Sequence, residues 1–553
     1  MTLRYPNQII RGKSRTFVPI FLIIIALALS AFIHLWNPIG FPYFHGDEGH
    51  YIRRAMHLLE GLGPQEAKSE YENPYDHPYF GQLFLAGVFS IVGYPNLVPI
   101  SDGSVEELKN SVEQLYLFPR ILMGLLAVLD TFLIYKITER MYSRNAAFVA
   151  AVLFAVMPLT WLTRRVVLES IFLPLILSSL LCAVYLRPIY HKDVDKRKNK
   201  FFDKETRKSN ILLLISGILL GLAIFTKTTA IMIVPLLIYL ILVHSNKNIK
   251  PLRLWFLPVI LIPMIWPAYA LASGQLQEWV DGVLWQSDRD GRGLFLSFMA
   301  SFKIDPLLWI VGLSSVVLVT AIRKDLFFVF WLVPFLLFYA SISFMQHFHY
   351  IFLLPILCMA AGVGISEILS KITIRQNISF NKPLLYGILS AIFIFGFVST
   401  VLLITTNLNG SLFEAQALVI KFLPSSAQKG QSSNETVILM GSNWMQLFSW
   451  IPEYIFGKGH SFETFIERNL PIEQIDTKKV LLLVDGKDFE RFILAGEKEG
   501  SFENQRLYNS TRKIAEIEEQ SDYYKKYRDK YPYTSIHENR GIEGGRIIMK
   551  TNY

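Results

Sequence analysis

Long apolar stretches recur along most of this chain and constrain its fold more than any other feature. A helix needs about 17 or more mostly apolar residues to cross a bilayer. Stretches close to that length occupy residues 17–35, 118–137, 146–162, 167–186, 211–226, 229–243, 252–272, 306–322, 326–344, 350–367 and 384–405. With 52% hydrophobic residues among 553, the chain is too apolar for an ordinary soluble protein. We therefore predict an α-helical polytopic membrane protein.

One further apolar segment, residues 79–95, decides the predicted topology. Short cytoplasmic loops of membrane proteins are enriched in Lys and Arg. If residues 79–95 crossed the bilayer, the strongly basic loop 187–208 would lie outside, whereas an in-plane 79–95 leaves every basic loop inside. We therefore predict about 11 spans, a cytoplasmic N-terminus and an interfacial or re-entrant helix at 79–95. The outer loop 36–117 and the C-terminus then face outward.

The composition changes near residue 406, where apolar runs shorten and charge rises. Strand-like runs at 437–440 and 480–484 alternate with segments compatible with helices. The sequence thus predicts a transmembrane catalytic domain over 1–405 and a small, soluble, extracytoplasmic α/β domain over 406–553. In that topology the sequons at Asn409, Asn434 and Asn509 would be exposed to a glycosylation machinery.

Charge and cysteine content exclude two other classes of protein. The formal net charge is +9, but the Lys and Arg residues gather in short loops between apolar runs, so topology explains them better than nucleic-acid binding does. Cys182 and Cys358 both fall within predicted spans. They offer neither a disulfide framework nor a cysteine-based metal site.

An acidic pair, Asp47-Glu48, follows the first apolar stretch by about a dozen residues. Ionised groups are costly near lipid, so acids at such a depth usually line a polar cavity or take part in chemistry. The structural alternatives are a solvated loop acid or helix N-cap for Asp47 and a first-turn helix acid for Glu48. The pair is the strongest candidate for a catalytic site.

Other polar residues fall at the predicted outer ends of the spans. They are His77, Arg120, Arg164, Arg165, Glu169, Lys227, His347, His349 and Tyr350. Carboxylates and cations on one face of a helical bundle suit an anionic, membrane-borne substrate that a neutral nucleophile attacks. Snorkelling interface anchors for the cations and a polar helix end for the histidines are the alternatives.

These motifs together resemble the GT-C glycosyltransferases, in the branch of protein O-mannosyltransferases and lipid A aminoarabinose transferases. The matching features are Asp47-Glu48 with Tyr51, His77-Pro78, Arg120 with Leu122-x-x-Gly124-Leu125-Leu126, Tyr135 with Arg140, and Gly217-x-x-x-Gly221-Leu-Ala-x-Phe-Thr-Lys227. The resemblance covers about residues 1–370. Two departures, His77-Pro78-Tyr79 in place of His-Pro-Pro and Phe348-His349-Tyr350 near the tenth span, bear on which sugar and acceptor are used.

The resemblance implies a polyprenyl-phosphate sugar as donor and assigns roles to the candidate residues. Asp47 would be the base, and Glu48 with Arg120 would form an orienting ion pair behind it. Arg164, Arg165 and Lys227 would face the phosphate. His77, His349 and Tyr350 complete the expected substrate-binding set. A divalent metal held by Asp47 and Glu48 is a further possibility.

The sequence therefore predicts an inverting transferase that moves a hexose such as mannose from a polyprenyl phosphate to a hydroxyl, with protein Ser or Thr as one acceptor. Transfer to a lipid or a cell-surface polysaccharide is the alternative acceptor reading. A transporter or flippase of lipid-linked substrates is the alternative class, but it would place charges within the spans and broken helices near the membrane midplane, whereas here the charges collect at the outer ends. An oligosaccharyltransferase would carry a Trp-Trp-Asp-type motif, which residues 434–553 lack.

Overall fold

The structure of the protein is a computed structural model. It describes residues 17–64, 73–96, 98, 103–186, 204–245, 247–289, 293–342, 344–374, 381–422, 437–440, 450–451, 454, 462–465, 479–485, 512–517 and 547–551. Most of the basic loop 187–208, on which the topology prediction rests, lies outside these residues.

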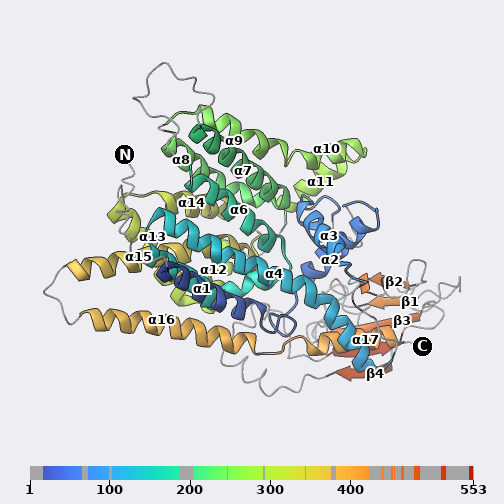
Figure 1. The fold of residues 1–553 in the computed structure, drawn as a ribbon. Helices are drawn as coiled ribbons and strands as arrows, with labels where there is room; N and C mark the ends of the chain where they lie inside the picture. The colour runs from blue at the N-terminus through green and yellow to red at the C-terminus, as the bar shows by residue number, and fades with distance from the viewer. Residues whose placement is uncertain are drawn as a thin grey trace.

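The described residues are mostly helical (Figure 1). The helices of the first half are α1 Phe17–Leu35, α2 Gly46–Leu59, α3 Phe80–Val92, α4 Val105–Met141, α5 Arg144–Val156, η1 Pro158–Arg164, α6 Leu168–Val184, α7 Lys204–Thr226, η2 Thr228–Ile233 and α8 Val234–His244. Those of the second half are α9 Lys250–Leu261, α10 Ile265–Ala272, α11 Leu276–Ser287, α12 Leu294–Ile304, α13 Pro306–Arg323, α14 Phe327–Ser341, η3 His347–Leu353, α15 Leu354–Ile374, α16 Asn381–Ile404 and α17 Gly410–Phe422.

Every apolar stretch named above is helical in the structure, although several helices are broken. Within the described residues, 6 helices are long and apolar enough to cross a membrane, or 7 if the bent pair α5 and η1 is one span. Shorter apolar helices include α6, α8 with η2, and α14. The prediction of about 11 spans remains a prediction.

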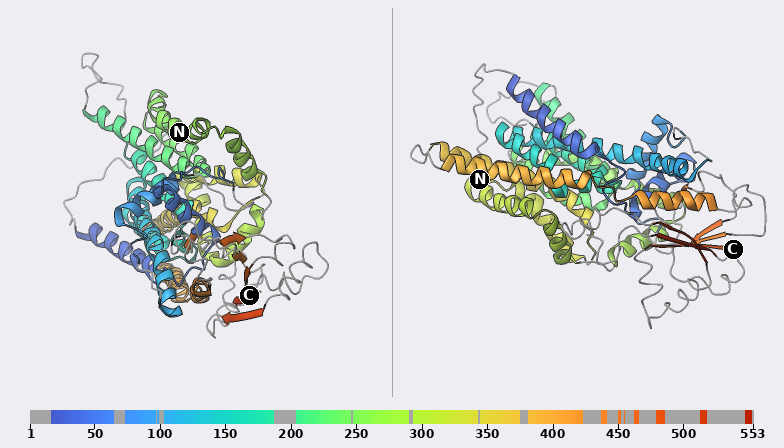
Figure 2. Two further views of the ribbon diagram at one scale, coloured as in Figure 1. Left: turned by 90° about the vertical axis from the view of Figure 1, so that its right-hand side faces the viewer. Right: turned by 90° about the horizontal axis from the view of Figure 1, so that it is seen from below.

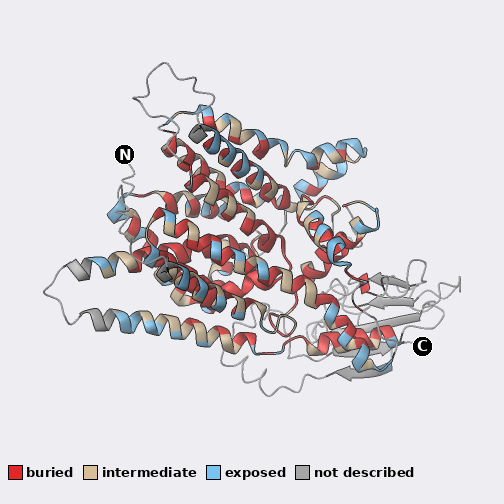
Figure 3. Ribbon diagram, viewed as in Figure 1, coloured by how far each residue is buried: buried red, intermediate tan, exposed pale blue. Residues whose placement is uncertain are grey.

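The core of the bundle is formed by α4, α5, α6, α7, α13 and α15, which pack against one another. Figure 3 shows that buried residues follow these helices, whereas α16 lies along the outside with much of its surface exposed. Close helix approach sets the position of α4. A Cβ atom on Gly124 would lie 2.6 Å from the carbonyl oxygen of His34, so this glycine permits α4 to pack tightly on α1.

The short helices α2 and α3 contact each other and lie at the end of the bundle that also carries the C-terminal sheet (Figure 1), and Figure 2 gives two further views of this arrangement. α3 has 13 residues, which corresponds to roughly 20 Å at 1.5 Å per residue. A hydrocarbon core of about 30 Å is too thick for it to cross. Its length therefore agrees with the interfacial helix predicted for residues 79–95.

The C-terminal residues form a five-stranded sheet in the order β2-β1-β3-β5-β4. Its strands are β1 Val437–Met440, β2 Phe462–Phe465, β3 Lys479–Asp485, β4 Arg512–Ile517 and β5 Ile547–Thr551. β1 is parallel to β2 and β3, while β5 is antiparallel to β3 and β4. The two predicted strands are confirmed. Helix α17 contacts both the sheet and α4, and the division at residue 405 stays a prediction.

Candidate active site

Local capping fixes the direction of the two acids at the start of α2. His45 is the N-cap, and its backbone amide donates to Glu48 Oε1 at 3.0 Å in a capping box. The amide of Asp47 donates to His45 Nδ1 at 3.3 Å. Both acids therefore sit in the first turn, where the helix dipole favours negative charge, but Glu48 turns back toward the loop. The N-cap alternative for Asp47 does not apply, because His45 holds that position.

Glu48 is fully buried, and both of its carboxylate oxygens are occupied. Arg120 donates from Nε to Oε2 at 2.9 Å and from Nη2 to Oε1 at 2.8 Å. The amide of Val166 donates to Oε2 at 3.1 Å. Burial would raise the pKa of Glu48, but Arg120 holds that pKa below its usual range. The predicted ion pair between Glu48 and Arg120 is confirmed.

Three buried arginines fasten the loop 36–44, which leads from α1 to α2. Arg120 Nη1 donates to Pro38 O at 2.8 Å and to Pro42 O at 2.7 Å. Arg165 Nη2 donates to Tyr43 O at 2.9 Å, and Arg164 Nη2 donates to Trp36 O. Arg165 Nη1 also lies 2.7 Å from His347 Nε2. In this structure the two arginines predicted to meet a phosphate instead hold the backbone of the loop.

Asp47 differs from the other carboxylates of this region because its side chain retains 37% exposure. The imidazole of His45 lies beside it, with Nδ1 3.4 Å from Asp47 Oδ1. Burial alone would raise the pKa of Asp47, but His45, His50 and Arg289 together hold it well below its ordinary value. Asp47 is therefore an ionised, accessible carboxylate at neutral pH.

Lys227 and His349 converge on one buried acid, Glu169. Lys227 Nζ lies 2.5 Å from Glu169 Oε1, and His349 Nε2 lies 3.6 Å from the same oxygen. Lys227 also lies over the ring of Phe348, 5.2 Å from its centroid. The structure thus brings Lys227 and His349 together, with the lysine charge balanced by Glu169.

His77 was predicted as a site residue, but the contacts of its neighbour Asp76 were not. His77 Nε2 lies 3.4 Å from Gln286 Nε2, and the adjacent Asp76 pairs with Arg54 at 2.7 Å. Burial lowers the pKa of His77 to about 3, so its ring is neutral. The Asp76–Arg54 pair was missed, although Arg54 stands seven residues after Asp47 and so shares a face of α2 with it.

Arg289 is a second cation near the acidic pair, within residues 286–290, a stretch that the sequence offers as a candidate contact for substrate. Its guanidinium lies 4.1 Å from the ring centroid of Phe344 and 4.7 Å from that of Trp285. It is partly exposed, and among the described residues it contacts ring faces rather than a carboxylate. It contributes to the low pKa of Asp47.

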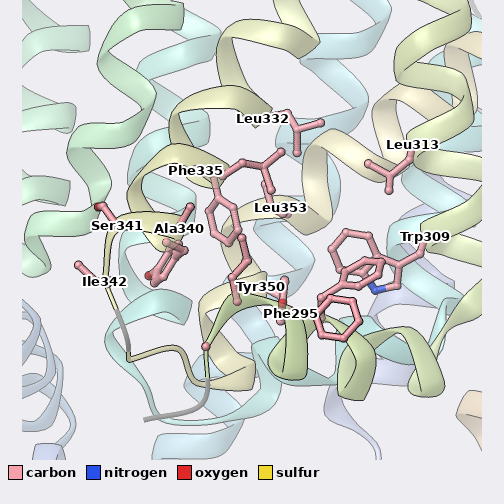
Figure 4. A pocket seen from close by; sticks show the side chains of 15 residues that line it. Phe295, Trp309, Leu313, Leu332, Phe335, Ala340, Ser341, Ile342, Tyr350 and Leu353 are labelled. Carbon is pink, nitrogen blue, oxygen red and sulfur yellow. The ribbon is translucent and has the colours of Figure 1, made fainter. Parts of the chain in front are cut away.

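Tyr350 does not lie with Asp47. It lines an apolar cavity of about 540 Å³ between α12, α13, α14 and η3 (Figure 4). Its ring centroid is 5.3 Å from that of Trp309 and 6.1 Å from that of Phe335. The cavity and the polar residues meet at Tyr339, which lines the cavity and stacks on His349 at 5.0 Å.

The donor set near Asp47 does not fit a divalent metal shared with Glu48. Both Glu48 oxygens already accept hydrogen bonds from Arg120 and backbone amides, and hard cations require free oxygen ligands. Within the part of the chain that the structure describes, no group of three or more His, Cys, Asp or Glu side chains is placed to hold a metal ion.

Comparison with known proteins supports the predicted class. A sequence-family model described as dolichyl-phosphate-mannose-protein mannosyltransferase matches residues 67–272. No curated protein matches the chain. The solved structures that are similar over nearly the whole chain include the following two. One is the Archaeoglobus fulgidus oligosaccharyltransferase tethered to an acceptor peptide containing the NVT sequon, with a TM-score of 0.58, 12% identity and coverage of 97% of this chain and 89% of that one.

The other is ArnT from Cupriavidus metallidurans bound to undecaprenyl phosphate, with a TM-score of 0.54, 13% identity and coverage of 97% and 98%. At such identities these likenesses show the fold, which is the predicted GT-C fold of a multi-pass membrane protein. With the family match, they confirm the predicted class of enzyme, a glycosyltransferase of the kind that uses polyprenyl-phosphate sugars.

Proposed function

We propose that this enzyme moves a hexose, with mannose as the first candidate, from a polyprenyl phosphate to a hydroxyl of a protein Ser or Thr at the outer face of the membrane. The observation that carries the proposal is Asp47. Glu48, Glu169 and Asp76 are each paired with a cation at 2.5–2.8 Å. Asp47 instead keeps an ionised, accessible carboxylate beside them.

One carboxylate suffices for this chemistry. The oxygen of the acceptor hydroxyl attacks the anomeric carbon while the bond from that carbon to the phosphate oxygen breaks. The electron pair leaves with the polyprenyl phosphate, the hydroxyl proton passes to Asp47, and the configuration inverts. A phosphate leaves without protonation, so the second carboxylate of a glycoside hydrolase is not needed. Glu48 then serves to orient the loop.

The leaving phosphate requires positive charge, which Arg289 and Lys227 supply. Arg289 is the cation of this region that is partly exposed and stacked on aromatic rings. Lys227 is paired with Glu169, and both Lys227 and Arg289 lower the pKa of His77, although burial lowers it most. Charge-assisted hydrogen bonds from these groups would stabilise the departing oxygen.

The apolar cavity suits the lipid chain of the donor. It is lined by apolar and aromatic side chains of α12, α13, α14 and η3, and it reaches the polar site at Tyr339 and His349. A polyprenyl chain in this cavity would place its phosphate toward Lys227. The solved relatives were captured with undecaprenyl phosphate or, in one Archaeoglobus fulgidus structure, with a dolichol-phosphate.

The deciding experiment is transfer by the purified enzyme from a synthetic polyprenyl-phosphate mannose. Peptides rich in Ser and Thr are offered beside lipid and polysaccharide acceptors, and the product is analysed for its anomeric configuration. We expect an inverted mannosyl peptide. Transfer only to a lipid or polysaccharide would mean that protein is not the acceptor. Flipping of the lipid without sugar transfer would favour the transporter alternative.

The orientation in the membrane belongs to the same proposal. The N-terminus is cytoplasmic, and residues 36–117 and 406–553 are extracytoplasmic, because the basic loops then lie inside. Cysteines introduced within the loop 187–208 should react with a membrane-impermeant reagent only from the cytoplasmic side. Labelling from outside would require residues 79–95 to span.

A further inference from the structure

The segment that follows α16 lies against the loop 36–44, which leads to the acidic pair at the start of α2. The amide of Leu408 donates to Gly40 O at 2.8 Å. Asn37 Nδ2 donates to Ile404 O at 2.9 Å and Thr406 O at 3.0 Å. The end of α1 and the end of α16 are thus joined by hydrogen bonds between residues far apart in the sequence.

Asn409 is the centre of this contact, and its side chain is fully buried. Its Oδ1 accepts the amide of Phe44 at 3.1 Å. Its Nδ2 lies 2.6 Å from Ile39 O, 3.1 Å from Gly40 O and 3.0 Å from Pro42 O. One amide side chain therefore contacts four residues of the loop: it accepts from Phe44 and lies within hydrogen-bond distance of three carbonyl oxygens. Burial also overturns the expectation that the sequon at Asn409 is exposed to glycosylation.

We propose that Asn409 is a positioning residue for the transfer reaction, which sets the loop 36–44 and thereby the N-cap that presents Asp47. The proposal rests on the proposed role of Asp47 as the base. Pro42 O accepts from both Asn409 and Arg120, so two anchors from distant segments meet on one carbonyl group. Phe44 directly precedes His45, whose side chain accepts the amide of Asp47.

A neutral amide is well suited to this position. The loop is already held by three arginines, and a further cation would add repulsion among buried charges. An amide supplies both a donor and an acceptor without charge. The catalytic geometry consequently depends on a residue beyond the predicted end of the transmembrane domain at 405.

The test uses the full-length enzyme with Asn409→Ala and the isosteric Asn409→Asp, which keeps an acceptor for Phe44 but turns an oxygen toward three carbonyls. Ser411→Ala is the matched control, because it removes the sequon and leaves Asn409 intact. We expect the kcat of both Asn409 variants to fall by about 10²-fold, as displacement of a reactive group by about 1 Å can cause. The donor KM should stay near that of the wild type.

Two further readouts separate positioning from general stability. Hydrogen exchange should quicken at the amides of residues 36–48 and stay unchanged elsewhere. The acid limb of the rate profile should move to higher pH, because His45 is held less firmly beside Asp47. A purely structural role would lower activity equally at all pH values.

The proposal is overturned if Asn409→Ala keeps the wild-type kcat, or if activity falls equally at every pH while exchange at 36–48 is unchanged. If Asn409→Ala does not fold, Asn409→Asp decides by the same readouts. Wild-type enzyme that transfers no sugar would refute the proposed function instead, and the exchange measurement would still test the role of Asn409 in holding the loop.

Discussion

The two adjacent carboxylates of α2 have opposite surroundings. Glu48 is sealed within the protein and accepts hydrogen bonds from Arg120, from Val166 and from the N-cap amide. Asp47, one residue earlier, is partly exposed, and His45 Nδ1 lies 3.4 Å from its Oδ1. One acid is therefore fixed to hold the loop, and its neighbour remains available for chemistry. A reactive group needs such support if it is to keep its geometry.

The largest loss of stability and activity is expected when Glu48, the buried acid of the pair, loses its partner Arg120. Arg120→Ala would leave Glu48 buried without its counter-charge, a change that typically costs about 3–5 kcal/mol. The loop 36–44 would also lose the contacts to Pro38 and Pro42. We expect a markedly lower unfolding temperature in detergent and no measurable transfer. Lys109→Ala is the control, because its partner Glu106 is 71% exposed and surface pairs contribute little.

An Arg120→Ala protein with a wild-type unfolding temperature would contradict the view that Glu48 depends on this partner. It would show that the capping box and Val166 alone stabilise the buried carboxylate.

Asp47→Asn should affect activity without affecting stability. The amide keeps the shape of the side chain but does not accept the acceptor proton, so turnover should fall roughly 10²–10⁴-fold. Donor affinity and unfolding temperature should match those of the wild type. Transfer from synthetic donor and direct donor binding are the two measurements. Loss of donor binding would instead make Asp47 a substrate-placing residue, and near-normal turnover would exclude it as the base.

Arg289→Gln should weaken donor binding. Removing a charge-assisted contact to the phosphate is expected to lower affinity by roughly 10-fold. Arg289→Lys keeps the charge but loses the planar stacking on Phe344 and Trp285, so an intermediate affinity is expected. Unchanged affinity in both variants would leave Lys227 as the main phosphate contact.

The sequence predicted the elements of this site better than their roles. Helical segments, the outer cluster of charges and the Glu48–Arg120 pair followed from hydropathy and from the resemblance to a family. The hydrogen bonds of Arg164 and Arg165 to the loop backbone could not be predicted, because an arginine that binds a backbone carbonyl and one that binds a substrate look the same in sequence. Contacts across the chain, such as Asn409 with Pro42, leave no local signal at all.

The pH dependence should show a smaller effect. The pKa of Asp47 lies below its ordinary value, so this base is ionised throughout the neutral range and should impose no acid limb there. Arg289 is one of the charges that lower this pKa, so Arg289→Gln should raise it and move the loss of activity to a higher pH. The pH profile of kcat/KM for both proteins checks this shift. An unchanged profile would mean that Arg289 is too far from Asp47 to influence it.

The smallest effect is expected at Tyr350, which the sequence grouped with the site and the structure places in the apolar cavity. Tyr350→Phe removes only a hydroxyl from a wall shared with Trp309 and Phe335, so kcat should change by less than about twofold, within the usual range for isosteric swaps.

Tyr350→Ala removes the ring, and its cost should appear only with long-chain donors, because a short chain buries less apolar surface there. The comparison is made with donors of two polyprenyl lengths at equal phosphate concentration. If Tyr350→Phe lowered kcat strongly with the short donor, the hydroxyl would act at the reacting sugar, and the separation between the apolar cavity and the Asp47 site would not hold in the working enzyme.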